Sequence, residues 1–288
     1  MRLGKPSRTA LAAAFHRAAH QVLEGGRIYC DPLALRILGE DAEAVARQAA
    51  EQPSRRRMRA FIAARTRFAE DALVAAIERA VSQVVILGAG LDTYAYRSSF
   101  KNGMHPLTAG ARLRTFEVDH PATQEWKRQR LRDVDIPLPD ALTFAPVDFE
   151  HETLADGLRA AGFDCEQQTF FTWLGVVPYL KEEAVWVTLA FIASLPHGAH
   201  VVFDYSDPPA TLPPEARARH DRRAARVAAL DEPWVTYFEA AMLRARLTAL
   251  GFTEIEDLGP AQIASRYFPS YAKSLPNKGG HILRATTL

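Results

Sequence analysis

The feature that most constrains this chain is a short apolar run that ends in two closely spaced glycines. Residues 84–87 read Val-Val-Ile-Leu, and Gly88, Ala89 and Gly90 follow them directly. Four consecutive apolar residues are typical of a strand that is buried on both faces, as in a parallel sheet. Glycine permits a sharp turn and a close approach to a ligand at the carboxyl end of such a strand, where α/β folds bind ligands. Residues 84–93 therefore form a candidate nucleotide site, and an ordinary strand-to-helix turn is the alternative.

Further apolar runs and helical patterns alternate along the chain. We expect strands at residues 113–118, 142–147, 169–174, 201–205, 252–258 and 280–285. We expect helices at residues 8–25, 32–39, 55–81, 94–97, 122–131, 181–194 and 236–250. This alternation predicts an α/β fold with a doubly wound, mostly parallel sheet and right-handed crossovers. A single domain over residues 1–288, with a helical N-terminal extension over residues 1–60, accounts for the pattern.

Two segments are rich in arginine. Residues 207–235 contain five prolines around a basic helical run at 217–226, and they follow the fifth expected strand. This segment is too long for a simple connection, so we interpret it as a lid or substrate-binding insertion. Residues 55–59 hold four arginines, which we expect on a solvated helix face.

Composition excludes several classes of partner. The 35 basic and 34 acidic residues leave a net charge of +1, so no overall field attracts nucleic acid or an anionic membrane. Cys30 and Cys165 are the two cysteines, too few for a disulfide framework or a four-cysteine zinc site, and we expect no metal. No apolar run is long enough to span a membrane, and we find no signal-peptide core. We therefore expect a cytoplasmic protein that binds a small molecule, with no nucleic-acid or membrane partner.

Acidic residues follow the next two expected strands. Asp119 ends the strand after the glycine turn, where nucleotide-binding α/β folds place a carboxylate on the ribose hydroxyls. The alternative is that Asp119 caps the following helix. Asp148 and Phe149 follow the strand at 142–147, and such a pair can bind a purine through its exocyclic amine and its ring face.

Four stretches together resemble the leucine carboxyl methyltransferase family. They are Val84–Arg97 (VVILGAGLDTYAYR), Phe116–Pro121 (FEVDHP), Val147 with Asp148, and Gly175–Leu180 (GVVPYL). The resemblance runs from about Arg8 to Ala285. It implies a class I S-adenosylmethionine-dependent methyltransferase with a seven-stranded sheet, of which the last strand is antiparallel.

The resemblance also implies roles for residues at the cofactor. Gly88 and Gly90 would lie along its methionine part, and Asp119 would hold its ribose. Asp148 and Phe149 would hold the adenine.

One arginine of the chain matches a further position of the family pattern, and two other residues depart from that pattern. Arg65, in the sequence RTRFAED, matches the family position whose guanidinium pairs with the cofactor carboxylate, with Arg67 as the alternative. Tyr94 stands where the family often has arginine, and Leu174 stands where it has an acid before the glycine. Leu174 cannot accept a hydrogen bond from the ammonium group of the cofactor. A nearby backbone carbonyl does so, or the affinity falls.

Methyl transfer from a sulfonium is an in-line displacement, in which orientation can contribute roughly 7 to 11 kcal/mol. A phenol acceptor needs a base, whereas a carboxylate does not. The polar candidates near the expected pocket are Tyr179, Tyr205, His120 and His281, with Tyr179 and Tyr205 as the predicted substrate contacts. We do not assign a catalytic base from the sequence.

The proline-rich segment favours O-methylation of a small, partly apolar metabolite, either a phenol or a carboxylate, because a flap of this kind can close over such a molecule. The alternatives are carboxyl methylation of a protein C-terminus and a catalytically silent cofactor-binding protein. A nicotinamide-dependent oxidoreductase is less consistent with the chain. Thr93 stands where the third glycine of that fingerprint belongs, and no Tyr-x-x-x-Lys pair follows the fourth strand.

Overall fold

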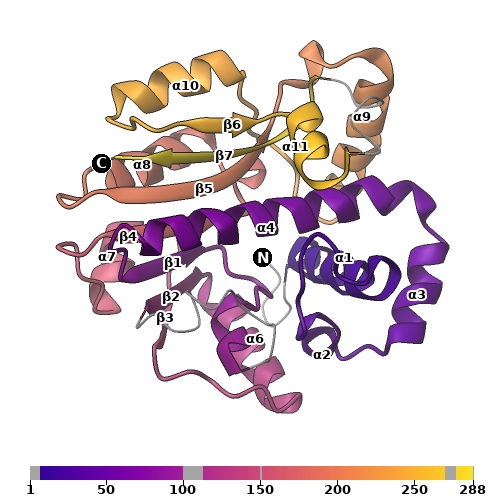
Figure 1. Ribbon diagram of the computed structural model, residues 1–288, viewed down its shortest axis with the longest axis horizontal. Coiled ribbons are helices and arrows are strands. Elements are labelled where there is room, and N and C mark those ends of the chain that lie inside the picture. Colours follow the sequence, from indigo (N-terminus) through magenta and orange to yellow (C-terminus); the bar gives the residue numbers. More distant parts are fainter. Residues whose placement is uncertain (1–6, 100–112, 150, 270–276, 288) are drawn as a thin grey trace. The chain divides into compact units, whose positions relative to one another are not determined.

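The computed structural model describes residues 7–99, 113–149, 151–269 and 277–287. The chain forms two compact units, Met1–Phe163 and Asp164–Leu288. Figure 1 shows the elements of both units, and each unit is described by itself. The single-domain organisation inferred from the sequence stays a prediction.

The first unit contains three parallel strands in the order β3-β2-β1. They are β1 (Gln83–Leu87), β2 (Arg114–Asp119) and β3 (Leu142–Pro146). All five residues of β1 are buried, as the apolar run predicts for a strand that is covered on both faces. Leu87 pairs with Val118, so the residues that follow β1 and β2 leave the sheet at the same edge.

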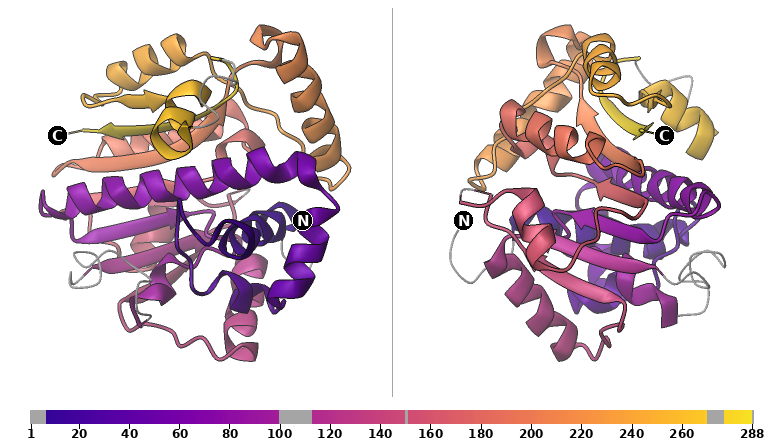
Figure 2. Two further views of the ribbon diagram at one scale, coloured as in Figure 1. Left: turned by 45° about the vertical axis from the view of Figure 1, so that its right-hand side comes forward. Right: turned by 90° about the vertical axis from the view of Figure 1, so that its left-hand side faces the viewer.

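The helices of the first unit precede β1, connect its strands and follow β3. They are α1 (Arg8–Glu24), α2 (Ala34–Leu38), α3 (Ala42–Ala50), η1 (Pro53–Arg55), α4 (Arg56–Ile77), η2 (Tyr94–Ser99), α6 (Pro121–Asp133) and α7 (Leu154–Ala160). Helix α1 lies against α2, α3 and α4 (Figure 2). The sequence interpretation missed α3 and α7, because α3 buries only Val45 and Ala49 and α7 spans only seven residues.

The sequence led us to expect all four arginines at 55–59 on a solvated face. This expectation was wrong for Arg59. Arg59 is buried, and its Nε and Nη2 atoms donate to the two carboxylate oxygens of Glu24 at 2.8 and 2.6 Å. Burial alone would raise the pKa of Glu24, but hydrogen bonds from His20 and Arg59 outweigh it and lower the pKa to about 2. The helical pattern of α4 did not reveal that α1 covers this arginine.

The second unit contains four strands in the order β4-β5-β7-β6. They are β4 (Thr169–Trp173), β5 (Ala199–Ser206), β6 (Glu256–Leu258) and β7 (Gly280–Thr286). β4 and β5 are parallel, and β7 is antiparallel to β5 and to β6. Its helices are η3 (Val177–Tyr179), α8 (Glu182–Ala193), η4 (Pro209–Thr211), α9 (Pro214–Ala228), α10 (Ala240–Ala249) and α11 (Pro260–Tyr267).

Two boundaries in the second unit differ from the sequence interpretation. Helix α10 begins at Ala240 and not at residue 236, because the preceding segment is extended and Phe238 N–H donates to the Ser206 carbonyl at 3.1 Å. Strand β6 covers only 256–258, since the Thr253 N–H donates to the Thr286 carbonyl at 2.8 Å outside the β6–β7 ladder. Helix α11 was also missed.

The fold class inferred from the sequence is confirmed. The protein has an α/β fold with a seven-stranded, mostly parallel sheet and N-terminal helices, and its last strand is antiparallel. Among the helices that the structure describes, none is long and apolar enough to cross a membrane.

Candidate functional site

The turn after β1 requires glycine at two positions. Gly88 and Gly90 have φ angles of +64° and +41°, in the left-handed region that side-chain-bearing residues rarely adopt. A Cβ atom placed on Gly90 would lie 3.0 Å from the Cβ of Ala10 on α1. The backbone of the turn is therefore approached closely by helix α1, and any larger residue at Gly90 would disturb that packing.

Asp119, the last residue of β2, is bonded to this turn. Its Oδ2 accepts the Gly90 N–H at 2.6 Å, and its Oδ1 accepts the His120 N–H at 2.7 Å. Burial raises the pKa of Asp119 above its usual value, although the two N–H donors act in the opposite direction. The alternative role as a helix cap does not hold, because the side chain of His120 caps α6 by accepting the Ala122 N–H at 3.2 Å.

Asp148 and Phe149 follow β3 at the same edge of the first unit. The Val147 N–H donates to the Asp119 carbonyl at 3.0 Å, and Asp148 Oδ2 lies 3.9 Å from His120 Nε2. The Phe149 side chain is half exposed, with an exposed fraction of 50%. The structure thus brings Gly90, Asp119 and Asp148 to one edge of the sheet, and the exposed Phe149 follows Asp148 in the chain. Such residues are suited to bind the ribose and base of a nucleoside.

The two arginines considered for the cofactor carboxylate lie on α4 in different environments. Arg67 is exposed, and its Nε donates to Asp71 at 2.7 Å in an i,i+4 pair. Arg65 is half-buried, and its guanidinium lies 6.0 Å from the centre of the Phe61 ring. The charge of Arg67 is paired on the surface, and Arg65 keeps the role that the family resemblance implies for it. Its contact with the cofactor stays a prediction.

A buried ion pair that the sequence interpretation missed supports the residues after the glycine turn. The Arg97 guanidinium pairs with Glu70 of α4 and lies 5.8 Å from the ring centre of Tyr94 and 5.2 Å from that of Tyr29. Burial raises the pKa of Tyr94. Tyr94, one of the two departures from the family pattern, is therefore a packing partner of a buried arginine. A single arginine at the end of the tyrosine-rich stretch LDTYAYR was the signal that could have indicated this ion pair.

The other departure, Leu174, lies next to a carboxylate from a different strand. Asp204 on β5 is buried, and its Oδ1 accepts the N–H of Gly175 at 2.5 Å. The sequence interpretation looked for an acid at position 174 itself. An acid inside the apolar strand sequence AHVVFDYS was the available signal, because a buried carboxylate needs a specific partner.

Tyr205 lies in a buried polar network at the carboxyl end of β5. Its hydroxyl donates to Asp257 Oδ2 at 2.6 Å, and its ring stacks on that of His281 at 4.7 Å. His281 bridges two carboxylates, with Nδ1 at 2.9 Å from Asp257 Oδ1 and Nε2 at 3.0 Å from Asp207 Oδ2. Burial acts to lower the pKa of His281, but these two hydrogen bonds outweigh it and raise the pKa to about 9. His281 is therefore protonated near neutral pH.

Tyr179 lies on η3, directly after the loop that follows β4. The Pro178 carbonyl accepts the Val235 N–H at 2.8 Å, and the Thr236 hydroxyl donates to the Leu180 carbonyl. Tyr179 itself is half-buried. The far end of the segment 207–235 is thus fixed to the loop that carries Tyr179. Neither the role of Tyr179 nor that of Tyr205 at the substrate is tested by these contacts.

The seven-stranded α/β sheet, with a glycine turn after β1 and an acid at the end of β2, has the architecture of class I methyltransferases. The family model described as "Leucine carboxyl methyltransferase" matches residues 10–193. The chain belongs to this family, and S-adenosylmethionine is its cofactor. The turn with Gly88 and Gly90, the Asp119 carboxylate and the exposed Phe149 ring are residues of the kind that can bind that cofactor.

Named relatives agree with this assignment. The chain is 33% identical over 213 residues to "Putative S-adenosyl-L-methionine-dependent methyltransferase YktD" of Bacillus subtilis, covering 74% of this chain and 67% of that protein. It is 32% identical over 212 residues to a protein of Mycolicibacterium smegmatis named as a methyltransferase of the same cofactor, covering 73% of this chain and 61% of that protein.

Solved structures are similar in fold. A crystal structure described as a putative methyltransferase from Thermobifida fusca superposes with a TM-score of 0.57 at 15% identity, covering 99% of this chain and 96% of that one. A DUF574 family protein from Streptomyces avermitilis gives a TM-score of 0.54 at 15% identity, covering 98% of each chain.

We expect Asp119→Ala to weaken the binding of S-adenosylmethionine by about 1.5 to 3 kcal/mol, the range for losing hydrogen bonds to a charged acceptor. The variant also leaves the Gly90 N–H without its acceptor. Isothermal calorimetry on the folded variant measures the change, and circular dichroism confirms the fold. An unchanged affinity would remove Asp119 from the ribose site.

We expect Gly90→Val to abolish cofactor binding, because the branched side chain would meet Ala10 and would strain the left-handed backbone. Gly25→Val is a matched control. Gly25 also has a positive φ angle, +61°, but a Cβ atom there meets nothing within 4 Å. The control shares the backbone strain and should bind the cofactor as the wild type does. Equal loss in both variants would indicate a purely structural turn.

His281 should make the free energy of unfolding depend on pH. Its pKa is raised to about 9 in the folded chain from an ordinary value of 6.5, so its stabilisation is complete below the lower value and is lost as the pH rises through the higher one. The loss should be on the order of 3 kcal/mol, because one pKa unit corresponds to about 1.4 kcal/mol. In urea unfolding, the difference between the wild type and His281→Asn should therefore shrink in alkaline buffer. A difference that stays constant from neutral to alkaline buffer would contradict the raised pKa of His281.

Proposed function

We propose that this protein transfers the methyl group of S-adenosylmethionine to an oxygen atom of a small, partly apolar metabolite. One observation carries the proposal: the segment 207–235 begins after β5 and returns to the carboxyl ends of β4 and β5. Val235 N–H donates to the Pro178 carbonyl at 2.8 Å, and Phe238 N–H donates to the Ser206 carbonyl at 3.1 Å. In α/β folds these strand ends face the bound ligand.

The inner side of this segment is aromatic. His220 of α9 is buried, and its ring centre lies 5.6 Å from that of Trp234 and 5.4 Å from that of Tyr237. Helix α9 otherwise exposes charged residues, several of them in i,i+4 pairs such as Arg217 with Asp221. A segment with a charged outer face and aromatic contacts at its base is suited to cover a small ligand. A protein tail in an open groove would require less cover.

The polar groups near the strand ends favour a carboxylate acceptor over a phenol. His281 is already protonated between Asp207 and Asp257, so it cannot take a proton from the acceptor. The Nδ1 atom of His120 accepts the Ala122 N–H as a helix cap. Burial first, and then Asp257, raise the pKa of Tyr205, which stays neutral. A carboxylate arrives ionised and needs no base.

In this proposal the cofactor supplies an activated methyl group on its sulfonium, and the chain supplies binding and orientation. Asp119, Asp148 and Phe149 hold the nucleoside part, and Gly88 and Gly90 leave room for the methionine part. Tyr179 lies on the loop that follows β4 and orients the acceptor. Tyr205 supports that site through its bond to Asp257.

We expect turnover with small aryl or alkyl carboxylic acids, detected as S-adenosylhomocysteine together with the methyl ester. Phenols of matched size and a peptide ending in a free leucine carboxylate serve as comparison acceptors, and Gly90→Val serves as the cofactor-deficient control. Methylation of phenols alone would overturn the choice of acceptor. Turnover only with the peptide would favour a protein substrate, and cofactor binding without turnover across all acceptors would favour a silent binding protein.

A further inference from the structure

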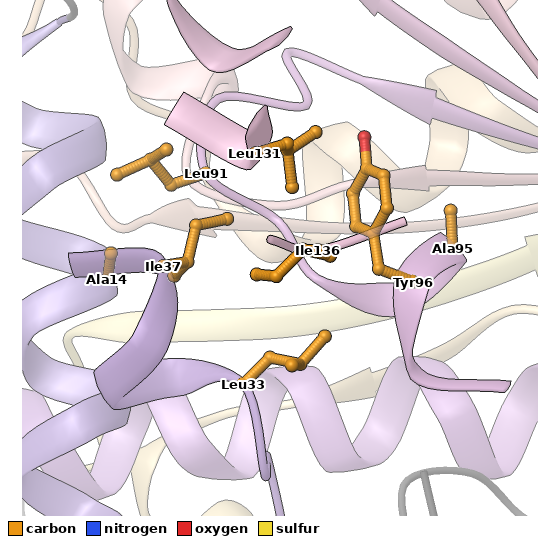
Figure 3. Packing of buried hydrophobic residues seen from close by; sticks show 8 residues of the cluster. All are labelled: Ala14, Leu33, Ile37, Leu91, Ala95, Tyr96, Leu131 and Ile136. Atoms are coloured by element: carbon orange, nitrogen blue, oxygen red, sulfur yellow. The ribbon is translucent and has the colours of Figure 1, made fainter. Parts of the chain in front are cut away.

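Helix α1 contacts the glycine turn through one stripe of side chains. The helix begins at Arg8 with Ser7 as its N-cap, whose hydroxyl accepts the Ala10 N–H at 3.1 Å. The Cβ of Ala10 lies where it would meet a Cβ on Gly90 at 3.0 Å. One turn further along, Ala14 is fully buried in the same hydrophobic cluster as Leu91 (Figure 3). Positions 10, 14 and 17 share a helix face, because residues three and four apart are neighbours.

Arg17 completes this stripe with a charged side chain. It is buried, with an exposed fraction of 8%, and its Nη2 donates to the carbonyl of Leu91 at 2.5 Å. Its Nε lies 3.4 Å from Asp31 Oδ2. A guanidinium has several donors in a fixed plane, so one arginine can hold a backbone carbonyl and a carboxylate together.

Asp31 continues the network to the far side of the turn. It is almost completely buried, and its Oδ2 also accepts the hydroxyl of Thr93 at 2.8 Å. Its Oδ1 accepts the Leu33 N–H at 3.0 Å at the start of the α2 region. Arg17 and Asp31 therefore fix the carbonyl of Leu91 and the side chain of Thr93, the two residues that flank Asp92.

The turn is thus held from two directions. Asp119 binds the Gly90 N–H from the end of β2, and Arg17 binds the Leu91 carbonyl from α1. A cofactor site must be held within a fraction of an ångström to bind well, and such precision comes from residues that support the contact residues.

We propose that Arg17 and Asp31 are positioning residues for the cofactor, which act through the Leu91 carbonyl and the Thr93 hydroxyl without touching the cofactor. Helix α1 then contributes to cofactor binding, because it holds the glycine turn in place. The inference depends on the glycine turn contacting the cofactor, which Gly90→Val tests separately. It is independent of the methyl acceptor.

The structure supplies a matched control for Arg17. Arg59 is buried to a similar degree, with an exposed fraction of 6%, and it also forms an ion pair that involves α1, through Glu24. That pair lies at the other end of α1 and bonds no residue of the turn in the described contacts. Arg17→Met and Arg59→Met therefore both break a buried ion pair of α1, and only the first removes a bond to the turn.

We expect Arg17→Met to weaken S-adenosylhomocysteine binding at least about tenfold, since each tenfold change corresponds to about 1.4 kcal/mol and a bond to a charged donor contributes more. Arg59→Met should bind within about twofold of the wild type at an equal loss of thermal stability. Arg17→Lys, which can still reach the carbonyl but not both partners, should recover part of the affinity. Hydrogen exchange at residues 88–93 without ligand should be faster in Arg17→Met alone.

Thr93→Val keeps the proposal testable if Arg17→Met does not fold. It removes one hydroxyl at nearly constant volume, and we expect it to weaken binding by about threefold to tenfold, with Thr93→Ser restoring it. Equal losses of affinity in Arg17→Met and Arg59→Met would overturn the proposal. So would wild-type affinity in a folded Arg17→Met or Thr93→Val variant. A wild type that binds no cofactor would instead contradict the assignment of the site itself.

Discussion

The hydrogen bond between the Gly90 N–H and the Asp119 carboxylate is the interaction on which the turn at the proposed cofactor site depends. It joins the turn after β1 to the end of β2, two segments that the parallel register brings to one edge. A half-buried carboxylate that accepts two backbone N–H groups is costly to move, because each donor would lose its partner. The left-handed glycines make this geometry possible, since the turn can bring its N–H to the carboxylate without a side chain between them.

Other side chains far apart in the chain also hold the turn or the residues that follow it through hydrogen bonds and ion pairs. Arg17 and Asp31 hold the turn from α1 and the loop before α2, and Arg97 is held by Glu70 of α4. These buried charges are all paired, as burial requires. Residues of the N-terminal helices therefore contact the turn as well as residues of the strands do.

The second unit uses buried charge in a different way. His281 lies between Asp207 and Asp257 and carries a proton near neutral pH, while Tyr205 donates to Asp257. Such a network fixes the end of β5 against β7 and β6, and it keeps the His281 imidazole protonated. Our proposal of a carboxylate acceptor follows from that arrangement, because an acceptor that is already ionised needs no group to remove a proton.

Local features of this protein could be predicted from its residues alone. The apolar run with its glycines predicted β1 and its turn, and the motifs identified the family and its cofactor. The acids at the strand ends predicted roles for Asp119 and Asp148 at the cofactor, and those roles stay predictions. Only the tertiary structure decided which partners these residues have. The burial of Arg59 against Glu24, the bond of Asp204 to Gly175 and that of Arg17 to Leu91 join residues 35, 29 and 74 positions apart. Periodicity reports which face of an element is buried, but it carries no information about which distant element covers that face.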